Sequence, residues 1–161
     1  ISSKRVYGMF VRVGFSADVA SKLTKLTTYK GHLPQGAPTS TTIANLVFEP
    51  TGQKLQKLAE EHQLRLTTFV DDVTISSQSQ FKDLTPEMIR ILERDGFRIS
   101  QNKTSYKSGI VEITGVRCLN NSMTTTRKFK QKYEQRGTLS KATVHGLEQY
   151  KRRVKEISDQ K

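Results

Sequence analysis

Apolar residues spaced three and four positions apart predict two helices near the amino end of the chain. Gly14 is placed to end the first helix, and Ser16 is placed to cap the second. The same spacing predicts a third helix that begins at Ser40 or Thr41, one of which is expected to cap it. Pro50 is expected to kink or split this helix, because proline lacks the backbone N–H that a helix interior requires.

Between residues 64 and 76 the pattern changes to β-prone residues interleaved with threonines. Leu66 and Phe69 stand before the pair Asp71–Asp72, and Val73 follows it. This arrangement predicts two strands that turn at the aspartates. The two carboxylates are therefore expected at the tip of a hairpin.

The rest of the chain mixes both patterns and predicts an α+β fold, with a small antiparallel sheet packed on helices. A core is expected to about residue 120, followed by a helical tail over residues 121–161. The elements predicted in order are a helix from Thr85 to Gly96, a strand over Phe97–Ser100, a turn at 102–104, strands at 111–114 and 116–119 around Gly115, a turn at Asn120–Asn121, a basic helix over 127–136 and a helix capped by Ser140.

The net charge of +12 is unevenly distributed along the chain. Residues 1–33 carry six Lys or Arg and one acid, residues 34–126 carry ten of each, and residues 127–161 carry eleven Lys or Arg and four acids. A neutral middle between basic ends suits a polyanion such as nucleic acid, although a charge run is also typical of a plain solvated face. One cysteine and no long apolar run lead us to expect a soluble, cytoplasmic protein without membrane partners.

Asp71 and Asp72 have two interpretations on their own. Two adjacent carboxylates repel each other, and a hard divalent cation with oxygen ligands relieves the repulsion at neutral pH. Aspartate is also a good turn residue, and on this stretch alone the pair is somewhat more typical of a simple hairpin turn.

The segment from Gly31 to Ser40 is predicted to be a rigid loop, because Pro34, Gly36 and Pro38 exclude regular structure. It leads into the third predicted helix, whose first backbone N–H groups favour phosphate. Gln35 beside Gly36 suits close approach to a base pair. A plain connector between helices is the alternative.

In their order and spacing, these features closely resemble the palm of reverse transcriptases, specifically those of bacterial retrons and group II introns. The resemblance rests on the Leu33–Ser40 loop, on Asp71–Asp72 beginning 36 residues after Gln35, on the Asn102–Lys103 turn and on the strand pair at Thr114–Gly115. It implies a polymerase palm over residues 1–120 and the start of a thumb over residues 121–161.

The resemblance further implies an RNA-directed DNA polymerase that uses two Mg²⁺ ions, with Mn²⁺ as a substitute in vitro, to transfer nucleotides to a primer 3′-OH. The implied partners are an RNA template, a DNA or RNA primer and deoxynucleoside triphosphates. Asp71 and Asp72 would be the catalytic metal ligands. Gln35, Gly36, Ala37, Phe69 and Lys103 would line the nucleotide and template pocket, Gly115 would contact the primer, and Lys128, Lys151, Arg152 and Arg153 would contact the nucleic-acid backbone.

The chain departs from the family pattern at three points. Phe69 stands where tyrosine is usual, and Thr41 replaces a common proline. The family also needs a further aspartate on a strand upstream of the loop, which we expect to lie just before Ile1. We therefore expect residues 1–161 alone to bind Mg²⁺ weakly and to extend no primer. The alternatives are a nucleic-acid-binding or defence-associated module with the palm fold but no templated synthesis, and a basic helix-turn-helix binder.

Overall fold

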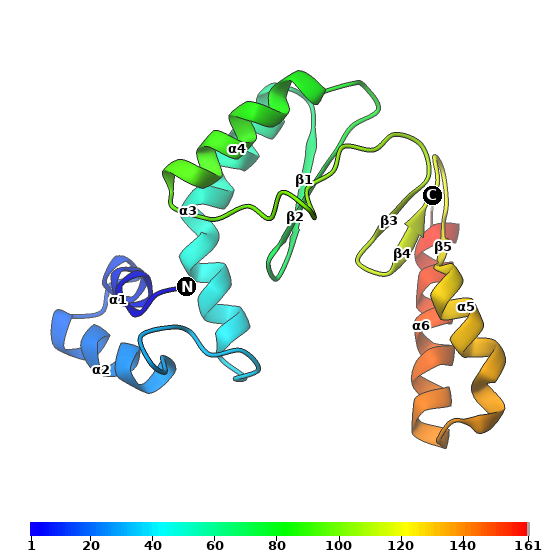
Figure 1. Cartoon of the computed structure of the whole chain (residues 1–161), viewed down its shortest axis with the longest axis horizontal. Coiled ribbons are helices and arrows are strands. Elements are labelled where there is room, and N and C mark those ends of the chain that lie inside the picture. Colours follow the sequence, from blue (N-terminus) through cyan, green and yellow to red (C-terminus); the bar gives the residue numbers. More distant parts are fainter. Residues whose placement is uncertain (161) are drawn as a thin grey trace. The chain divides into compact units, whose positions relative to one another are not determined.

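The computed structural model describes residues 1–160, which form two compact units. Unit 1 comprises Ile1–Ser100 and unit 2 begins at Gln101. Each unit combines helices with a small antiparallel sheet, so the predicted α+β class is confirmed (Figure 1). The units divide earlier than residue 120 because the strands of residues 111–125 form one sheet, whose last strand packs with the last helix. The expected boundary between palm and thumb stays a prediction.

The helices and hairpin of unit 1 follow the predicted order. They are α1 (Ser3–Arg12), α2 (Ala17–Thr27), α3 (Ser40–Glu61), β1 (Arg65–Phe69), β2 (Asp72–Ser76), the 3-10 turn η1 (Lys82–Leu84) and α4 (Thr85–Arg94). Gly14 follows α1 with a φ of 108°, a conformation that glycine adopts without strain. Ser16 holds the capping position of α2, but its side chain makes no capping hydrogen bond.

Unit 1 is packed around α3, which carries two separate buried clusters along its length (Figure 1). The cluster near the start of α3 consists of Val6, Met9, Ile43 and Val47, and it joins α3 to α1. The cluster near the end consists of Leu55, Leu58, Ala59, Leu64 and Met88, and it joins α3 to α4 and the hairpin. The position of the hairpin is therefore set by the second half of α3.

Two expectations for α3 differ from the structure. Pro50 does not split the helix, which continues from Ser40 to Glu61, because buried residues on both sides of the proline are held in different clusters; the alternative of a kink stays a prediction. That packing offsets a proline penalty of about 3 kcal/mol in a helix interior. Neither Ser40 nor Thr41 caps the helix: the capping position is Thr39, whose side chain makes no capping bond.

Asp95, directly after α4, ties this helix to α1 and α3. Its carboxylate accepts hydrogen bonds from Thr51 at 2.6 Å and from Lys54 at 2.7 Å, while its carbonyl accepts one from Arg5. The hydrogen bonds from Lys54 and Thr51 hold the pKa of Asp95 below its usual value. The end of α4 is thus fixed by polar contacts as well as by the core.

The strand predicted over Phe97–Ser100 does not form. The ring of Phe97 packs edge-on against Phe48, with centroids 5.3 Å apart, and the guanidinium of Arg5 lies 4.4 Å above it. Residues 97–100 have the alternation of a strand, but they run beside helices and pair with neither strand of the hairpin. A strand requires a neighbouring strand, which the local pattern does not specify.

Unit 2 consists of a three-stranded sheet followed by two helices. Its elements are β3 (Val111–Ile113), β4 (Val116–Cys118), β5 (Met123–Thr125), α5 (Arg127–Glu134), the 3-10 turn η2 (Gln135–Thr138) and α6 (Lys141–Asp159). β3 and β4 confirm the strands predicted around Gly115, and Ser140 caps α6 as predicted, its hydroxyl accepting from the N–H of Thr143. β5 was not predicted, because its sequence Met-Thr-Thr has only one apolar residue and no alternation.

None of the helices that residues 1–160 form has the length and apolar character needed to cross a membrane.

Candidate active site on the β1–β2 hairpin

The two aspartates predicted to be catalytic lie at the closed end of the hairpin. Phe69, the last residue of β1, pairs with Asp72, the first residue of β2. Val70 and Asp71 form the two-residue turn between them. All four residues are exposed. The predicted hairpin tip is confirmed, with Asp71 in the turn and Asp72 at the start of a strand.

The two faces of the hairpin have different surroundings. Leu66, Val73 and Ile75 pack against the buried cluster of α3 and α4. Neighbouring side chains along a strand point to opposite faces, and residues paired across an antiparallel ladder share a face. Phe69 and Asp72 therefore project from the face away from the helices. The ring of Phe69 is 64% exposed there.

Val70, the first turn residue, has a φ of 54°. A positive φ is a genuine outlier for a β-branched residue, because its Cβ substituents crowd the backbone in this region. Two-residue hairpin loops require a positive φ at the first central residue, so that the turn matches the twist of the strands. Glycine, asparagine or aspartate normally occupies this position. The turn that carries Asp71 is thus held in a strained conformation, as is common at functional sites.

The loop before α3 is closed on itself by a side chain. The hydroxyl of Ser40 donates a 2.6 Å hydrogen bond to the carbonyl of Pro34, and the Ser40 N–H donates to the carbonyl of Ala37 at 3.0 Å. Gly36 has a φ of 81°, and a Cβ at this position would meet no atom within 4 Å. Glycine is therefore favoured at position 36 by its positive φ and not by a lack of room for a side chain. Gln35 and Gly36 are exposed at its tip.

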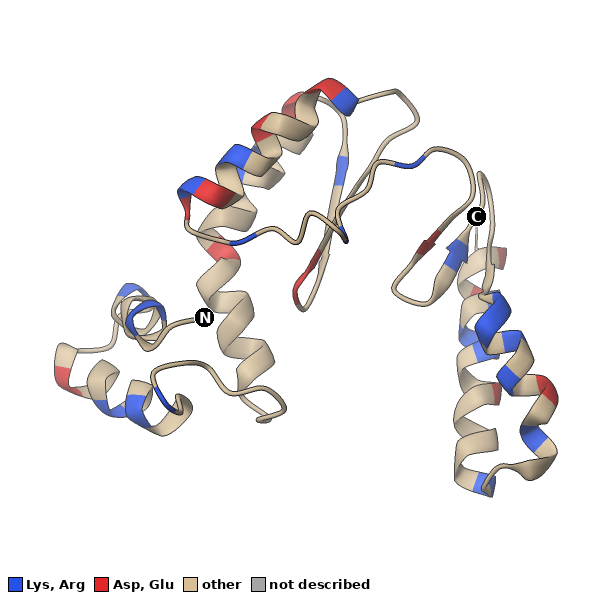
Figure 2. Cartoon of the chain, in the orientation of Figure 1, with Lys and Arg blue, Asp and Glu red and all other residues tan. Residues whose placement is uncertain are grey.

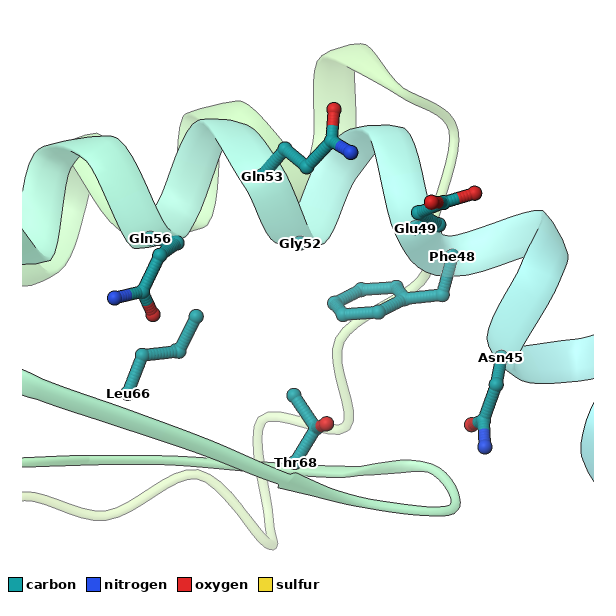
Figure 3. Close-up of a pocket in the computed structure, with 8 residues that line it drawn as sticks. All are labelled: Asn45, Phe48, Glu49, Gly52, Gln53, Gln56, Leu66 and Thr68. Atoms are coloured by element: carbon teal, nitrogen blue, oxygen red, sulfur yellow. The ribbon is translucent and has the colours of Figure 1, made fainter.

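The hairpin tip is directed back along α3 toward the start of that helix. α3 and β1 border an open cavity of about 490 Å³, with Leu66 opposite Gln56 at one end and Thr68 nearer Phe48 and Asn45 at the other (Figure 3). β1 thus runs antiparallel to α3, and Asp71 follows β1. Because the loop of residues 34–39 precedes α3, the loop and the acidic turn belong to the same end of unit 1.

The other predicted site residues lie in unit 2. Lys103 is exposed in the turn of residues 101–103. Gly115, with a φ of 86°, is the second residue of the turn between β3 and β4, and Thr114 before it has a φ of 46°. Positive φ at both central residues is typical of a type I′ hairpin turn.

The predicted backbone-contacting residues are exposed on the two helices of unit 2, where Figure 2 shows basic residues along α5. Lys128 lies on α5, and the ammonium group of Lys151 on α6 is 4.4 Å from the centre of the Tyr133 ring. Arg152 forms an ion pair with Glu156 at 2.7 Å, which raises the pKa of this arginine. Arg153 is 3.9 Å from the same carboxylate.

Two contacts near these residues had no signal in the sequence. The first is the bond from Ser40 to the Pro34 carbonyl. The second is a 3.0 Å hydrogen bond from the hydroxyl of Tyr150 on α6 to the carbonyl of Gly115. Side-chain bonds to a distant backbone carbonyl depend on three-dimensional neighbours, so spacing along the chain does not reveal them.

The carboxylates of Asp71 and Asp72 fit Mg²⁺ in the type of donor. Mg²⁺ takes oxygen ligands and is commonly held by one or two carboxylates together with water and substrate phosphates. Within residues 1–160 there is no group of three or more His, Cys, Asp or Glu residues that could hold a metal ion. The acidic turn therefore offers two carboxylates, marked in red at the hairpin tip in Figure 2, and leaves the remaining ligands to other groups.

The family match and the similar proteins point to the same family, the reverse transcriptases. The family described as "Reverse transcriptase (RNA-dependent DNA polymerase)" matches residues 6–138, a stretch that contains the loop, the acidic hairpin and the β3–β4 turn.

Three retron proteins are similar over parts of the chain. The retron Ec86 reverse transcriptase of Escherichia coli is 34% identical over 106 residues, which are 65% of this chain and 33% of the relative. The retron Mx65 reverse transcriptase of Myxococcus xanthus is 26% identical over 138 residues, 72% of this chain and 32% of the relative. The retron Se72 reverse transcriptase of Salmonella heidelberg is 39% identical over 88 residues, 54% and 22% respectively. The chain thus spans about a third or less of the length of these relatives.

Proposed function

The chain belongs to the reverse transcriptase family, and from this premise we propose that it is a fragment of an RNA-directed DNA polymerase of the retron type. The fragment would comprise most of the palm, residues 1–120, and the start of the thumb, residues 121–161. The observation that carries the proposal is the acidic turn at Asp71 and Asp72, exposed at the end of a hairpin whose other face is packed on α3.

Asp71 and Asp72 are the proposed catalytic ligands of Mg²⁺. When bound, two such ions would activate a primer 3′-OH and stabilise the leaving pyrophosphate. Asp71 stands in the turn, free of the strand pairing, and is the residue we assign to both ions. Asp72 is the partner that diverges from it, because it is the first residue of β2 and projects from the open face. The pairing of β1 with β2 and the packing of the hairpin on α3 and α4 hold the turn that carries Asp71, in spite of the strained φ of Val70.

The loop residues Gln35, Gly36 and Ala37 are the proposed floor of the pocket for the nascent base pair. The closure of the loop by Ser40 supports this role, since it fixes the exposed turn of Gln35 and Gly36 before a substrate arrives. Phe69 supplies an exposed ring on the face that also carries Asp72. Lys103 is the proposed neutralising charge for the triphosphate.

Unit 2 is the proposed contact to the primer and the template. Gly115 lies in an exposed hairpin turn, which suits close approach to a primer strand. Lys128, Lys151, Arg152 and Arg153 are exposed, and their charges suit the phosphate backbone of an RNA template paired with a DNA or RNA primer. The nucleotide substrates of this proposal are deoxynucleoside triphosphates.

The proposed polymerase site is incomplete within this chain. The acidic turn supplies two carboxylates, and the described residues contain no further acid grouped with them. The chain also spans about a third of the length of its retron relatives. We therefore assign a third metal-binding aspartate to a part of the full-length protein outside residues 1–161.

The test is Asp71→Asn in the full-length protein, assayed for primer extension on an RNA template and for RNA binding. We expect extension to vanish and RNA binding to persist, because the change removes one negative ligand without altering the basic helices. Asp83→Asn is the matched control, since Asp83 is an exposed acid in η1 on the same unit. Extension that survives in the Asp71 variant, or a wild type that binds RNA without templated synthesis, would reject the polymerase in favour of a binding module with the palm fold.

A further inference from the structure

The β3–β4 turn is connected to α6 by one side chain. The hydroxyl of Tyr150 donates a hydrogen bond of 3.0 Å to the carbonyl of Gly115, 35 residues earlier in the chain. A Cβ on Gly115 would lie 3.6 Å from that hydroxyl, which is ordinary van der Waals contact. The tyrosine therefore rests on the turn itself, at the residue proposed to approach the primer.

The orientation of Tyr150 is itself fixed by aromatic neighbours on α5. The ring centroid of Phe129 is 5.0 Å from that of Tyr150, and Phe129 stacks on Tyr133 with centroids 6.1 Å apart. Thr126 caps α5 by accepting a hydrogen bond from the N–H of Phe129. The Tyr150 side chain is half-buried in this cluster, which fixes the direction of its ring, while its hydrogen bond to the Gly115 carbonyl is exposed.

A second bond holds α6 to the same sheet. The N–H of Met123 in β5 donates to the hydroxyl of Ser158 at 3.0 Å. Ser158 lies eight residues after Tyr150, which is about 12 Å along a helix. Two attachments that far apart, together with the packing of α6 on β5, fix both the position and the direction of α6 relative to the sheet.

The turn depends on such support. β3 and β4 are three residues each, and Thr114 and Gly115 are exposed. β4 also pairs with β5, but β3 is an edge strand of this small sheet, and exposed turns open locally at little free-energy cost. The bond from Tyr150 is a contact that the turn receives from outside its own strands.

We propose that Tyr150 is a positioning residue that holds the Thr114–Gly115 turn in register with the exposed basic residues of α6. Lys151, Arg152 and Arg153 follow it directly, and they point in different directions because consecutive residues are about 100° apart around a helix. The inference rests on the proposed function: the turn and those basic side chains that lie on its side of α6 then contact one primer strand as a single preorganised surface, in place of two surfaces that must be ordered on binding. Preorganisation lowers the entropy lost on binding and acts mainly on the rate of primer release.

The test is Tyr150→Phe in the full-length protein, which removes the hydroxyl and keeps the ring. We expect primer–template to dissociate about two- to tenfold faster, the loss expected for one hydrogen bond. The KM for the deoxynucleoside triphosphate at saturating primer–template should be unchanged, because Tyr150 lies on α6 and not on the acidic hairpin, the Gln35–Gly36 loop or the turn that carries Lys103. Tyr133→Phe is the matched control: its hydroxyl makes no hydrogen bond within residues 1–160, and its ring belongs to the same cluster.

Amide hydrogen exchange of residues 113–116 gives a readout independent of activity. We expect faster exchange in Tyr150→Phe than in Tyr133→Phe, with equal exchange in the buried part of α3. Equal exchange in the two variants, or equal primer release, would overturn the positioning role. A wild type that binds no primer–template would overturn the proposed function as well, and the exchange result would then report on the contact between Tyr150 and the turn alone.

Discussion

The hydroxyl of Ser40 donates a hydrogen bond to the carbonyl of Pro34, and this bond closes the loop that precedes α3. Serine at a helix start normally accepts a hydrogen bond from a backbone N–H and so caps the helix. Here the hydroxyl donates instead, and its acceptor lies six residues before Ser40, outside the helix. The loop with Gln35 and Gly36 at its tip is thereby fixed to the first residue of α3.

Replacing Ser40 by alanine should loosen this loop. The bond is partly buried, and we expect a loss of about 0.5–1.5 kcal/mol in the free energy of unfolding of the chain. In the full-length protein the KM for the nucleotide should rise, because Gln35 and Gly36 are then less well placed. Urea unfolding and steady-state kinetics measure the two effects. Thr41→Ala, which removes one exposed hydroxyl from the next residue, is the control. It should change the free energy of unfolding by no more than a few tenths of a kcal/mol and leave the KM unchanged.

Replacing Val70 by glycine should stabilise the hairpin. The change relieves about 1–3 kcal/mol of backbone strain at a φ of 54°. Glycine has more conformational entropy in the unfolded chain, which offsets about 0.5–1 kcal/mol of this gain. We expect a net gain of about 1 kcal/mol in thermal or urea unfolding. Val73→Gly is the contrasting variant, because Val73 packs on the core and should lose about 2 kcal/mol. A Val70 variant as destabilised as the Val73 variant would contradict the assignment of strain.

The stability contributed by Asp95 should depend on pH. Its pKa is lowered in the folded state by Lys54 and Thr51, so the carboxylate binds its proton less readily when folded than when unfolded. This contribution is complete above the unfolded pKa of about 3.9 and is lost as the pH falls through the lower folded pKa. Asp95→Asn should therefore destabilise the chain at pH 7 and approach the wild type as the pH falls through the lowered folded pKa. Urea unfolding over a series of falling pH values makes the comparison, and a difference that stays constant with pH would contradict the prediction.

The basic residues of unit 2 should differ in their effect on the salt dependence of binding. Each phosphate contact contributes about 0.7–0.9 to the slope of log affinity against log salt concentration. Lys128→Ala should lower the slope by about that amount. Arg152→Ala should lower it less, because Glu156 already neutralises part of its charge at 2.7 Å. Titration of the full-length protein with primer–template at several salt concentrations measures the slopes, and Lys22→Ala on α2 is the control.

Residues 1–161 alone should bind Mg²⁺ weakly and extend no primer. Two carboxylates without a third acid leave most of the ion's ligands to water, so we expect no saturation below about 1 mM in a titration followed by calorimetry. Primer extension by the isolated chain on a primed RNA template would show that the two carboxylates suffice. The full-length protein, measured in parallel, controls for the quality of the assay.

Local signals in the sequence were enough to predict most elements and the acidic turn. Gly14 and Gly96 mark helix ends through positive φ, Ser140 marks a helix start through its side chain, and Asp71 and Asp72 stand at the tip that β-prone runs on both sides required. The resemblance to reverse transcriptases followed from the spacing of these signals and is confirmed by the family match. The helix ends, the helix start and the acidic turn each depend on residues within a few positions of one another, and the resemblance depends on the spacing between them, so the order of residues along the chain contains both.

Only the tertiary structure decided how the side chains are used. Ser40 donates to Pro34 where capping was expected, and Phe97 packs against Phe48 where a strand was expected. Tyr150 reaches Gly115 across 35 residues. The Phe48 ring, which becomes adjacent to Phe97 only on folding, outweighs the local preference of that segment for a strand, and the two hydrogen bonds depend on how the chain is folded between their partners. The acidic turn was therefore predictable from its own residues. The contacts that hold the Gln35–Gly36 loop and the Thr114–Gly115 turn in place were not.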